Sequence, residues 1–149
     1  TGVQTCALPI FETQGLKNHV TIIPGLPAGD PLLADAYRAA DLFLLTSLHE
    51  PFGIVVLEAW AAGCPVVTTA VGGIPHFTAD GEDVLRFASG DAAAGASLAW
   101  RVLANPGLAE KLGNNGRTKA CETYSWDRVT GQLADLYQEV LAEHKANHA

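Results

Sequence analysis

Glu50 and Glu58, separated by seven residues, are the side chains of this sequence best placed to do chemistry. Between Ile54 and Ala62 every neighbour of Glu58 is apolar: Ile54, Val55, Val56, Leu57, Ala59, Trp60, Ala61 and Ala62. A helix that is apolar on all sides is typically buried. Because a carboxylate is almost never buried without a partner, Glu58 needs a hydrogen-bond donor from the protein or from a ligand.

Glu50 lies in the loop that leads through Pro51 and Gly53 into this helix. Free N–H groups at a helix start bind anions such as phosphate. A carboxylate that binds hydroxyls beside an anion-binding helix end indicates a nucleotide sugar as ligand. Taken singly, each glutamate has another interpretation. Glu58 would pair with a lysine or a backbone donor, and Glu50 would be solvated or favoured by the helix dipole.

The elements around the glutamates predict a parallel sheet. Leu42–Leu45 is a continuous apolar run of the kind found in strands buried on both faces, and Pro65-Val-Val-Thr-Thr69 is expected to form another buried strand. A helix from about Gly53 to Ala62, ended by Gly63, lies between them. Strands that alternate with helices at this spacing imply parallel pairing with right-handed crossovers.

The loop that contains Glu50 and the loop that contains Gly72-Gly73 both follow predicted strands. Thr46–Phe52 leaves one strand and Ala70–Gly73 leaves the next. Ligands of parallel sheets bind outside the carboxyl ends of the strands. We therefore expect the two loops to lie at the same edge of the sheet.

The remaining elements follow from local signals. We expect strands at Val20–Ile23 and Val84–Phe87. Helices are expected at Pro31–Ala40, capped by Asp30, and at Asp91–Leu103. A further helix begins at Asn105-Pro106 and is expected to break near Gly113-Asn-Asn-Gly116, and a last helix begins at Ser125. Apolar residues of the last helix recur at helical spacing, which predicts core packing.

The ordered motifs resemble a known family. Glu50-Pro-Phe-Gly…Glu58-Ala-x-Ala-x-Gly63-x-Pro65-Val-Val resembles the E-x7-E motif of retaining GT-B glycosyltransferases, the clan of glycosyltransferase family four and glycogen synthase. Val71-Gly-Gly-Ile-Pro75 is similar to the glycine-rich turn that follows in those enzymes, and the resemblance runs from about Leu16 to Tyr137. It implies an α/β fold, a Rossmann-like parallel sheet flanked by helices, as in the C-terminal half of a GT-B fold truncated at its N-terminus. In that family the last helix runs back to the other domain, which would cover part of its apolar stripe.

The resemblance also implies roles. Glu50 would be catalytic and hold hydroxyls of the transferred sugar, and Glu58 would accept hydrogen bonds from the ribose. The other expected donor-binding residues are Phe52, Gly53, Ile54 and Val55 near the sugar and diphosphate, Gly72 and Gly73 beside them, and Gly25 and Leu26 near the base. The donor is a nucleotide-diphosphate sugar. We expect no metal and no further cofactor, since the family is metal-independent.

Three positions have competing interpretations. Gly72-Gly73 is either a tight turn or a place where backbone approaches the ligand closely. It is not a dinucleotide fingerprint, because no G-x-G-x-x-G opens a helix after a strand. His76 and Asp83 depart from the resembled family, which often has glutamate and glycine there. We expect His76 to pack rather than contact the donor, and the acidic turn that contains Asp83 to be solvated.

Composition limits the function classes. The chain has 149 residues, 48% of them hydrophobic, which suffices for one core. A net charge of −7 argues against nucleic-acid binding, which needs a basic face. No apolar run reaches the roughly 20 residues of a membrane span, so a cytoplasmic protein is expected, with membrane association of the parent protein left open. Cys64 and Cys121 are expected to be reduced core residues.

The first ten residues, Thr1-Gly-Val-Gln-Thr-Cys-Ala-Leu-Pro-Ile10, match one reading frame of a widely used short-read sequencing adapter. We interpret them as non-native, with a natural loop as the alternative, and exclude them from fold reasoning. Residues 11–142 are then expected to form a partial nucleotide-sugar-binding domain, and residues 143–149 a frayed tail. The partner of that domain would be a missing N-terminal Rossmann-like domain.

The resulting hypothesis is the donor-binding domain of a retaining glycosyltransferase. The fragment alone is expected to be inactive, because the acceptor site of the resembled family and the Arg and Lys that clamp the diphosphate fall outside it. Two alternatives stay open. One is a sugar-nucleotide epimerase of the same fold, which would form an epimer without an acceptor, and the other is a non-catalytic nucleotide-binding module.

Overall fold

A computed structural model describes residues 10–23, 25–27 and 29–147. Residues 1–9, which hold nearly all of the suspected adapter segment, and Pro24, which precedes the Gly25-Leu26 pair expected near the base, lie outside the described residues. The chain divides into two compact units, Thr1–Asp35 and Ala36–Ala149, which are described separately.

The first unit has little regular structure. Its described residues include the short 3-10 helix η1 (Lys17–His19), and an ion pair joins Lys17 Nζ to Glu12 Oε1 at 2.9 Å. The strand predicted at Val20–Ile23 is wrong, because these residues have no regular backbone structure. A strand is held by hydrogen bonds to a neighbouring strand, and the described part of this unit offers none. Four consecutive β-branched residues were therefore not sufficient to form a strand.

Helix α2 (Pro31–Ala39) begins in the first unit, and its predicted cap is confirmed. Asp30 Oδ1 accepts a hydrogen bond from the backbone N–H of Leu32 at 2.9 Å. This bond satisfies one of the N–H groups that have no partner within the helix.

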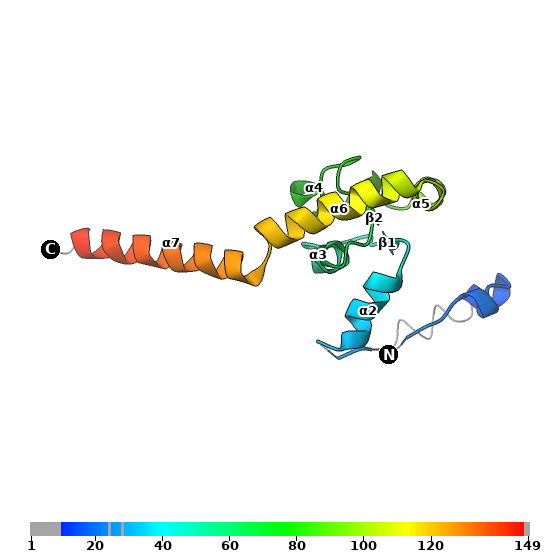
Figure 1. Ribbon diagram of the computed structural model, residues 1–149, viewed down its shortest axis with the longest axis horizontal. Coiled ribbons are helices and arrows are strands. Elements are labelled where there is room, and N and C mark those ends of the chain that lie inside the picture. Colours follow the sequence, from blue (N-terminus) through cyan, green and yellow to red (C-terminus); the bar gives the residue numbers. More distant parts are fainter. Residues whose placement is uncertain (1–9, 24, 28, 148–149) are drawn as a thin grey trace. The chain divides into compact units, whose positions relative to one another are not determined.

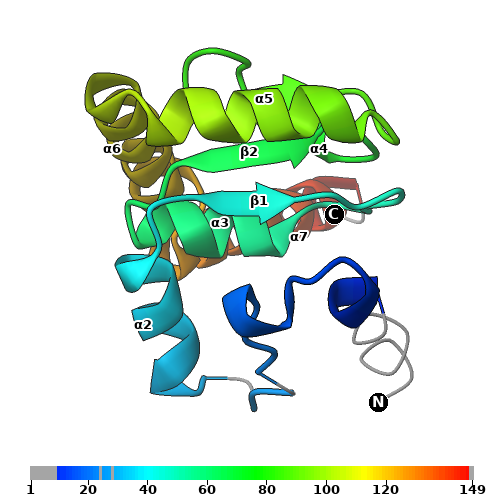
Figure 2. The ribbon, with the colours of Figure 1, turned by 90° about the vertical axis from the view of Figure 1, so that its right-hand side faces the viewer.

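The sheet of the second unit is parallel, as predicted. Among the described residues it contains β1 (Phe43–Leu45), β2 (Val66–Thr69) and β3 (Leu85–Phe87), in the order β1-β2-β3. Figure 2 shows α3 (Ile54–Ala61) on one face of this sheet and α5 (Ala92–Leu103) on the other. Successive strands are thus joined by crossovers that include helices.

The central strand β2 contributes to a core on each face of the sheet. Successive side chains of a strand point to opposite faces. Val66 packs in a cluster with Val56 and Trp60, whereas Val67 packs in a second cluster with Val102 and Leu112. Every residue of β2 is buried, which explains its uninterrupted apolar and β-branched sequence.

Helix α6 (Pro106–Thr123) is continuous, so the break predicted near residues 113–116 is wrong. Both glycines of that segment are buried where α6 meets other backbone and side chains. A Cβ at Gly113 would collide with the carbonyl oxygen of Gly63, and a Cβ at Gly116 would collide with the Trp60 ring. These glycines permit close packing of α6 and do not interrupt it.

Two further helices differ from expectation. The short helix α4 (Ile74–Phe77) was not anticipated. Helix α7 (Trp126–Asn147) runs past residue 142, so the tail is helical as far as Asn147 (Figure 1). Its apolar stripe does not form a core, since Trp126 is 82% exposed and Tyr137 is 63% exposed. Within the described part of the chain, no helix has the length and hydropathy that a bilayer span requires.

Candidate functional site

The loop that contains Glu50 and the loop that contains Gly72-Gly73 meet at the carboxyl edge of the sheet, as the sequence predicts. The backbone N–H of Gly73 donates a hydrogen bond to the carbonyl oxygen of Glu50 at 3.0 Å. Thr69 at the end of β2 donates through its hydroxyl to the carbonyl oxygen of Ser47 at 2.8 Å. The loops that follow β1 and β2 are therefore held together by direct hydrogen bonds.

Gly72 and Gly73 have no room for a side chain. Gly72 has a φ of +53°, and a Cβ there would collide with the Glu50 carbonyl oxygen. A Cβ at Gly73 would lie 2.5 Å from the Pro51 carbonyl oxygen and 2.9 Å from Phe52 Cα. The contact between the two loops thus accounts for both glycines. The interpretation that they also admit a ligand stays a prediction.

Gly53 occupies the N-cap of α3 in a left-handed conformation, with a φ of 105°. A Cβ there would collide with Cδ1 of Ile74 and lie 3.4 Å from Cζ of Phe77. Because glycine has no side chain, no side-chain hydrogen bond caps this helix start. The N–H groups of the first turn, including those of Ile54 and Val55, are those that a helix itself leaves without an acceptor.

Helix α3 is buried on one face only, which corrects the expectation of burial on all sides. Val56, Ala59 and Trp60 are buried, whereas Ile54 is 64% exposed. Phe52, just before the helix, is 42% exposed. An apolar composition thus predicted burial of the whole helix, but the described chain covers only part of it.

Aromatic rings support the loop that contains Glu50. Phe52 stacks on Phe77, with ring centroids 5.0 Å apart and an interplanar angle of 17°. Tyr124 meets both rings edge-on at 6.4 and 6.0 Å, and Trp60 meets Phe77 edge-on at 5.7 Å. Such offset and edge-on pairs add to the stability given by area burial. The loop at the start of α3 is therefore anchored to α4 and to the end of α6.

The carboxylate of Glu58 is half-buried and has a tyrosine as hydrogen-bond donor. The Tyr37 hydroxyl donates to Glu58 Oε2 at 3.2 Å. Burial and the neighbouring Glu58 charge raise the pKa of Tyr37 to about 12. The hydrogen bond from Tyr37 was not predicted from the sequence. The protein partners expected for Glu58 were a lysine or a backbone donor.

Glu50 is half-buried, and its backbone rather than its side chain is tied to the protein. Its carbonyl oxygen accepts from Gly73, and among the described residues no donor contacts its carboxylate. The structure thus places Glu50 at the junction of the two loops, with a carboxylate that receives no hydrogen bond from the part of the chain that the structure describes.

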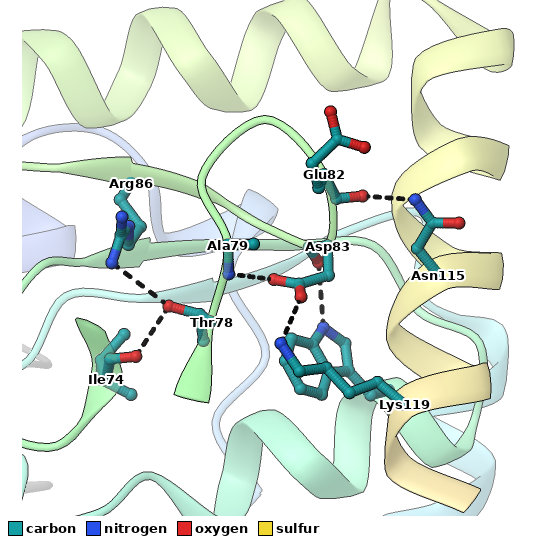
Figure 3. A network of polar contacts seen from close by, with 9 residues as sticks. Ile74, Thr78, Ala79, Glu82, Asp83, Arg86, Asn115 and Lys119 are labelled. Carbon is teal, nitrogen blue, oxygen red and sulfur yellow. Dashed lines mark hydrogen bonds and ion pairs between the residues drawn. The ribbon is translucent and has the colours of Figure 1, made fainter. Parts of the chain in front are cut away.

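Asp83 is not solvated, which corrects the expectation for this residue, whereas Asp80 and Glu82 of the same acidic turn are exposed as expected. Asp83 is buried, and its Oδ2 lies 2.7 Å from Lys119 Nζ (Figure 3). Its Oδ1 accepts from the N–H of Ala79 at 2.7 Å, and its carbonyl oxygen accepts from Trp60 Nε1 at 3.1 Å. Lys119 also lies 5.6 Å from the centre of the Trp60 ring. Asp83 therefore has a structural role.

Two more side chains of α6 bind the same turn. Asn115 Nδ2 donates to the Glu82 carbonyl oxygen at 2.8 Å, and Lys111 Nζ donates to that of Gly81 at 3.1 Å. Figure 3 shows Asn115 and Lys119 reaching the turn from one helix. The turn that precedes β3 is thus fixed to α6.

Three sequence-based expectations have different outcomes. His76 is exposed on α4, so the expected packing is wrong. Cys64 is buried as expected, whereas Cys121 is exposed. Gly25 and Leu26 belong to the first unit, and their assignment to the base stays a prediction.

A hollow of ≈ 470 Å³ lies away from these loops, lined by Asp41, Val102, Leu103, Pro106 and Ala109. Asp41 precedes β1, so the hollow is at the amino end of that strand, opposite to the edge where Glu50 lies. No group of three His, Cys, Asp or Glu side chains suited to a metal occurs within the described ranges. The predicted absence of a metal remains a prediction.

The chain matches the family of glycosyl transferases group 1 over residues 10–119, and it belongs to this family. It is 39% identical over 137 residues to a D-inositol 3-phosphate glycosyltransferase from Actinosynnema mirum, covering 87% of this chain and 32% of that protein. The chain thus spans about a third of the length of this relative.

Solved structures agree with the fold. Sucrose-phosphate synthase from Thermosynechococcus elongatus has a TM-score of 0.87 and 32% identity, over 95% of this chain and 35% of that one. HepE from Anabaena, solved in complex with UDP, has a TM-score of 0.81 and 24% identity, over 93% of this chain and 38% of that one. The same Anabaena protein was also solved with UDP-glucose. The parallel sheet with helices on both faces is the α/β arrangement of GT-B glycosyltransferases.

Proposed function

We propose that this chain is the donor-binding domain of a retaining glycosyltransferase that moves a sugar from a nucleotide-diphosphate sugar to an acceptor hydroxyl. One observation carries the proposal. The Gly72-Gly73 turn is docked on the Glu50–Phe52 loop, directly at the uncapped start of α3, the helix that also contains Glu58. The Glu50 loop and a helix end of the kind that binds anions thereby lie at one edge of the sheet, and Glu58 lies about one turn further along the same helix.

The diphosphate binds at the start of α3 in this proposal. The first N–H groups of the helix and its dipole favour negative charge there. When the bond between the sugar and the diphosphate breaks, negative charge grows on the leaving group. Preorganised N–H donors at that position lower the barrier without moving. The open N-cap created by Gly53 is the feature that makes these donors accessible.

In this proposal the two glutamates bind different hydroxyl groups of the donor. Side chains of a helix lean towards its N-terminus, so Glu58 is directed back towards a ligand bound there. We assign Glu58 to the ribose hydroxyls. Glu50 lies in the loop before the helix, and its carboxylate is assigned to hydroxyls of the transferred sugar. The UDP and UDP-glucose complexes of the Anabaena protein support a nucleotide sugar as donor.

The complete reaction requires a second domain in this proposal. The chain spans 32% of the length of the inositol-phosphate glycosyltransferase relative. In the resembled family the acceptor site belongs to an N-terminal Rossmann-like domain. The isolated 149-residue chain is therefore expected to bind a donor without transferring sugar. A transfer rate above background from the purified chain would contradict this expectation.

The test of donor binding is calorimetric titration of the purified chain with UDP, GDP and ADP, since the base is not specified by the sequence. At least one nucleotide should bind. Glu58→Ala should weaken that binding by about 1–3 kcal/mol, the range for a lost hydrogen bond to a charged group. Glu110→Ala removes an exposed glutamate of α6 and serves as the matched control. If the wild-type chain binds none of the three nucleotides, the assignment is rejected. It is also rejected if a folded Glu58→Ala variant binds the nucleotide as tightly as wild type.

A further inference from the structure

The contact between Tyr37 and Glu58 joins two helices that lie far apart in the sequence. Tyr37 belongs to the last turns of α2 and Glu58 to α3, and their hydrogen bond spans 21 residues of the chain. Both side chains are half-buried. The hydrogen bond holds one oxygen of the Glu58 carboxylate in place.

The Tyr37 ring is itself fixed by packing. It meets Phe43 of β1 edge-on, with centroids 5.4 Å apart and an interplanar angle of 75°. Both rings lie against the buried cluster on the α3 side of the sheet. The hydroxyl is therefore placed by a stiff, packed ring and not by a flexible side chain.

This hydrogen bond uses only part of the capacity of the carboxylate. An ionised carboxylate has about four acceptor sites on its two oxygens, whereas a tyrosine hydroxyl donates one hydrogen bond. Tyr37 occupies one site on Oε2. The remaining acceptor sites suit two neighbouring hydroxyls, such as those of a ribose. An oriented glutamate also loses less side-chain freedom when a ligand binds.

We infer that Tyr37 is a positioning residue that orients the Glu58 carboxylate and thereby sets the preference of the site for ribose over deoxyribose nucleotides. The inference rests on the proposed function, in which Glu58 binds the ribose. Tyr37 itself does not touch the ligand in this arrangement. Its effect must then vanish when Glu58 no longer carries the carboxylate or when the ligand has no ribose hydroxyls.

The experiment compares the binding of UDP and 2′,3′-dideoxy-UDP by the full chain; if the titration shows that another base is bound, that base replaces uracil in both ligands. Wild type should prefer UDP. Tyr37→Phe should weaken UDP binding by about two- to tenfold and leave 2′,3′-dideoxy-UDP unchanged, as expected for one hydrogen bond. In a Glu58→Gln background, Tyr37→Phe should have no further effect. Tyr137→Phe makes the same chemical change on the exposed face of α7 and is the control.

A second measurement does not depend on a ligand or on the Tyr37 variant. The chain has three tyrosines, so Tyr124→Phe with Tyr137→Phe leaves Tyr37 as the only phenol to titrate. Tyr37 should stay protonated at pH values where a free tyrosine ionises, and its pKa should fall when Glu58→Gln is added. An unchanged pKa would reject the contact.

The outcomes separate the two proposals. If wild type binds UDP and prefers it over the dideoxy analogue, but Tyr37→Phe keeps the same preference, the positioning role is wrong and the donor site stands. Equal loss of both ligands in Tyr37→Phe would indicate a merely structural role and would also reject the inference. If wild type binds neither UDP nor the other nucleotides of the panel, the donor site fails, and the role of Tyr37 fails with it.

Discussion

At the scale of single residues, loss of the Lys119 side chain should destabilise the second unit. It neutralises the buried Asp83 carboxylate at 2.7 Å and lies over the Trp60 ring. Removing one partner of a buried pair leaves an uncompensated charge, which costs about 3–5 kcal/mol when both are fully buried. Because Lys119 is 32% exposed, we expect Lys119→Met to cost less, roughly 1–4 kcal/mol in urea denaturation.

The matched control for that variant is Lys111→Met. Lys111 also reaches the acidic turn from α6, with its Nζ 3.0 Å from Glu82 Oε2, but both side chains of that pair are exposed. Exposed pairs contribute about 0–1 kcal/mol. Equal destabilisation by the two variants would show that burial of Asp83 does not govern the stability of this turn.

At the scale of elements, the docking of one loop on the other sets the geometry of the candidate site. Gly73→Ala places a methyl group against the Pro51 carbonyl oxygen and Phe52 Cα, and neither backbone group can rotate away. Overpacking of this kind costs typically about 1–3 kcal/mol. Thermal unfolding should show this loss, and nucleotide binding should weaken as well, because the Glu50 loop must move.

Gly131→Ala is the control for the loop variant. Nothing lies within 4 Å of a Cβ at Gly131, and the residue is in the exposed helix α7. Alanine favours a helix over glycine by about 0.5–1 kcal/mol, so the control should be neutral or stabilising. A Gly73→Ala variant as stable as Gly131→Ala would mean that the two loops are not held as described.

Elements with local signals were predictable from the sequence. Strand β1 is a continuous apolar run and β2 a run of β-branched residues, and the helices after Asp91 and Asn105 begin with side chains that cap them. The errors arise where structure depends on distant partners. Val20–Ile23 has no neighbouring strand among the described residues, and Gly113 and Gly116 do not interrupt α6 because they face other parts of the chain.

The candidate site was likewise predictable where it depends on topology and not where it depends on distant partners. Topology alone brings the loops after β1 and β2 to one edge, and their hydrogen bond confirms it. The donor to Glu58 was not predictable, because Tyr37 lies on another helix and no spacing rule connects the two residues. Asp83 was misjudged for the same reason, since its partner Lys119 lies 36 residues further along the chain.

At the scale of the whole molecule, the second unit contains two hydrophobic clusters and one long exposed helix. The clusters on the two faces of the sheet use residues of α3, α4, α5 and α6. Among the described side chains of α7, none belongs to either cluster, and Leu133, Leu136 and Leu141 are each about half exposed. Burial of apolar surface is the main source of stability, so α7 should contribute little to it.

Removal of residues 126–149 tests this distribution of stability. The shortened chain should keep its melting temperature within a few degrees, because it retains both clusters and the aromatic packing of Tyr124. It should also be less prone to associate, since an apolar stripe exposed on one helix is lost. Circular dichroism would follow the melting and light scattering the association. A longer deletion, of residues 112–149, removes the buried Leu112 and Ala120 together with Lys119 and should unfold the unit. Unfolding of the shorter deletion would show that α7 is needed to hold the second unit together. A longer deletion that melts like the shorter one would show that the α6 residues of the two clusters are not needed.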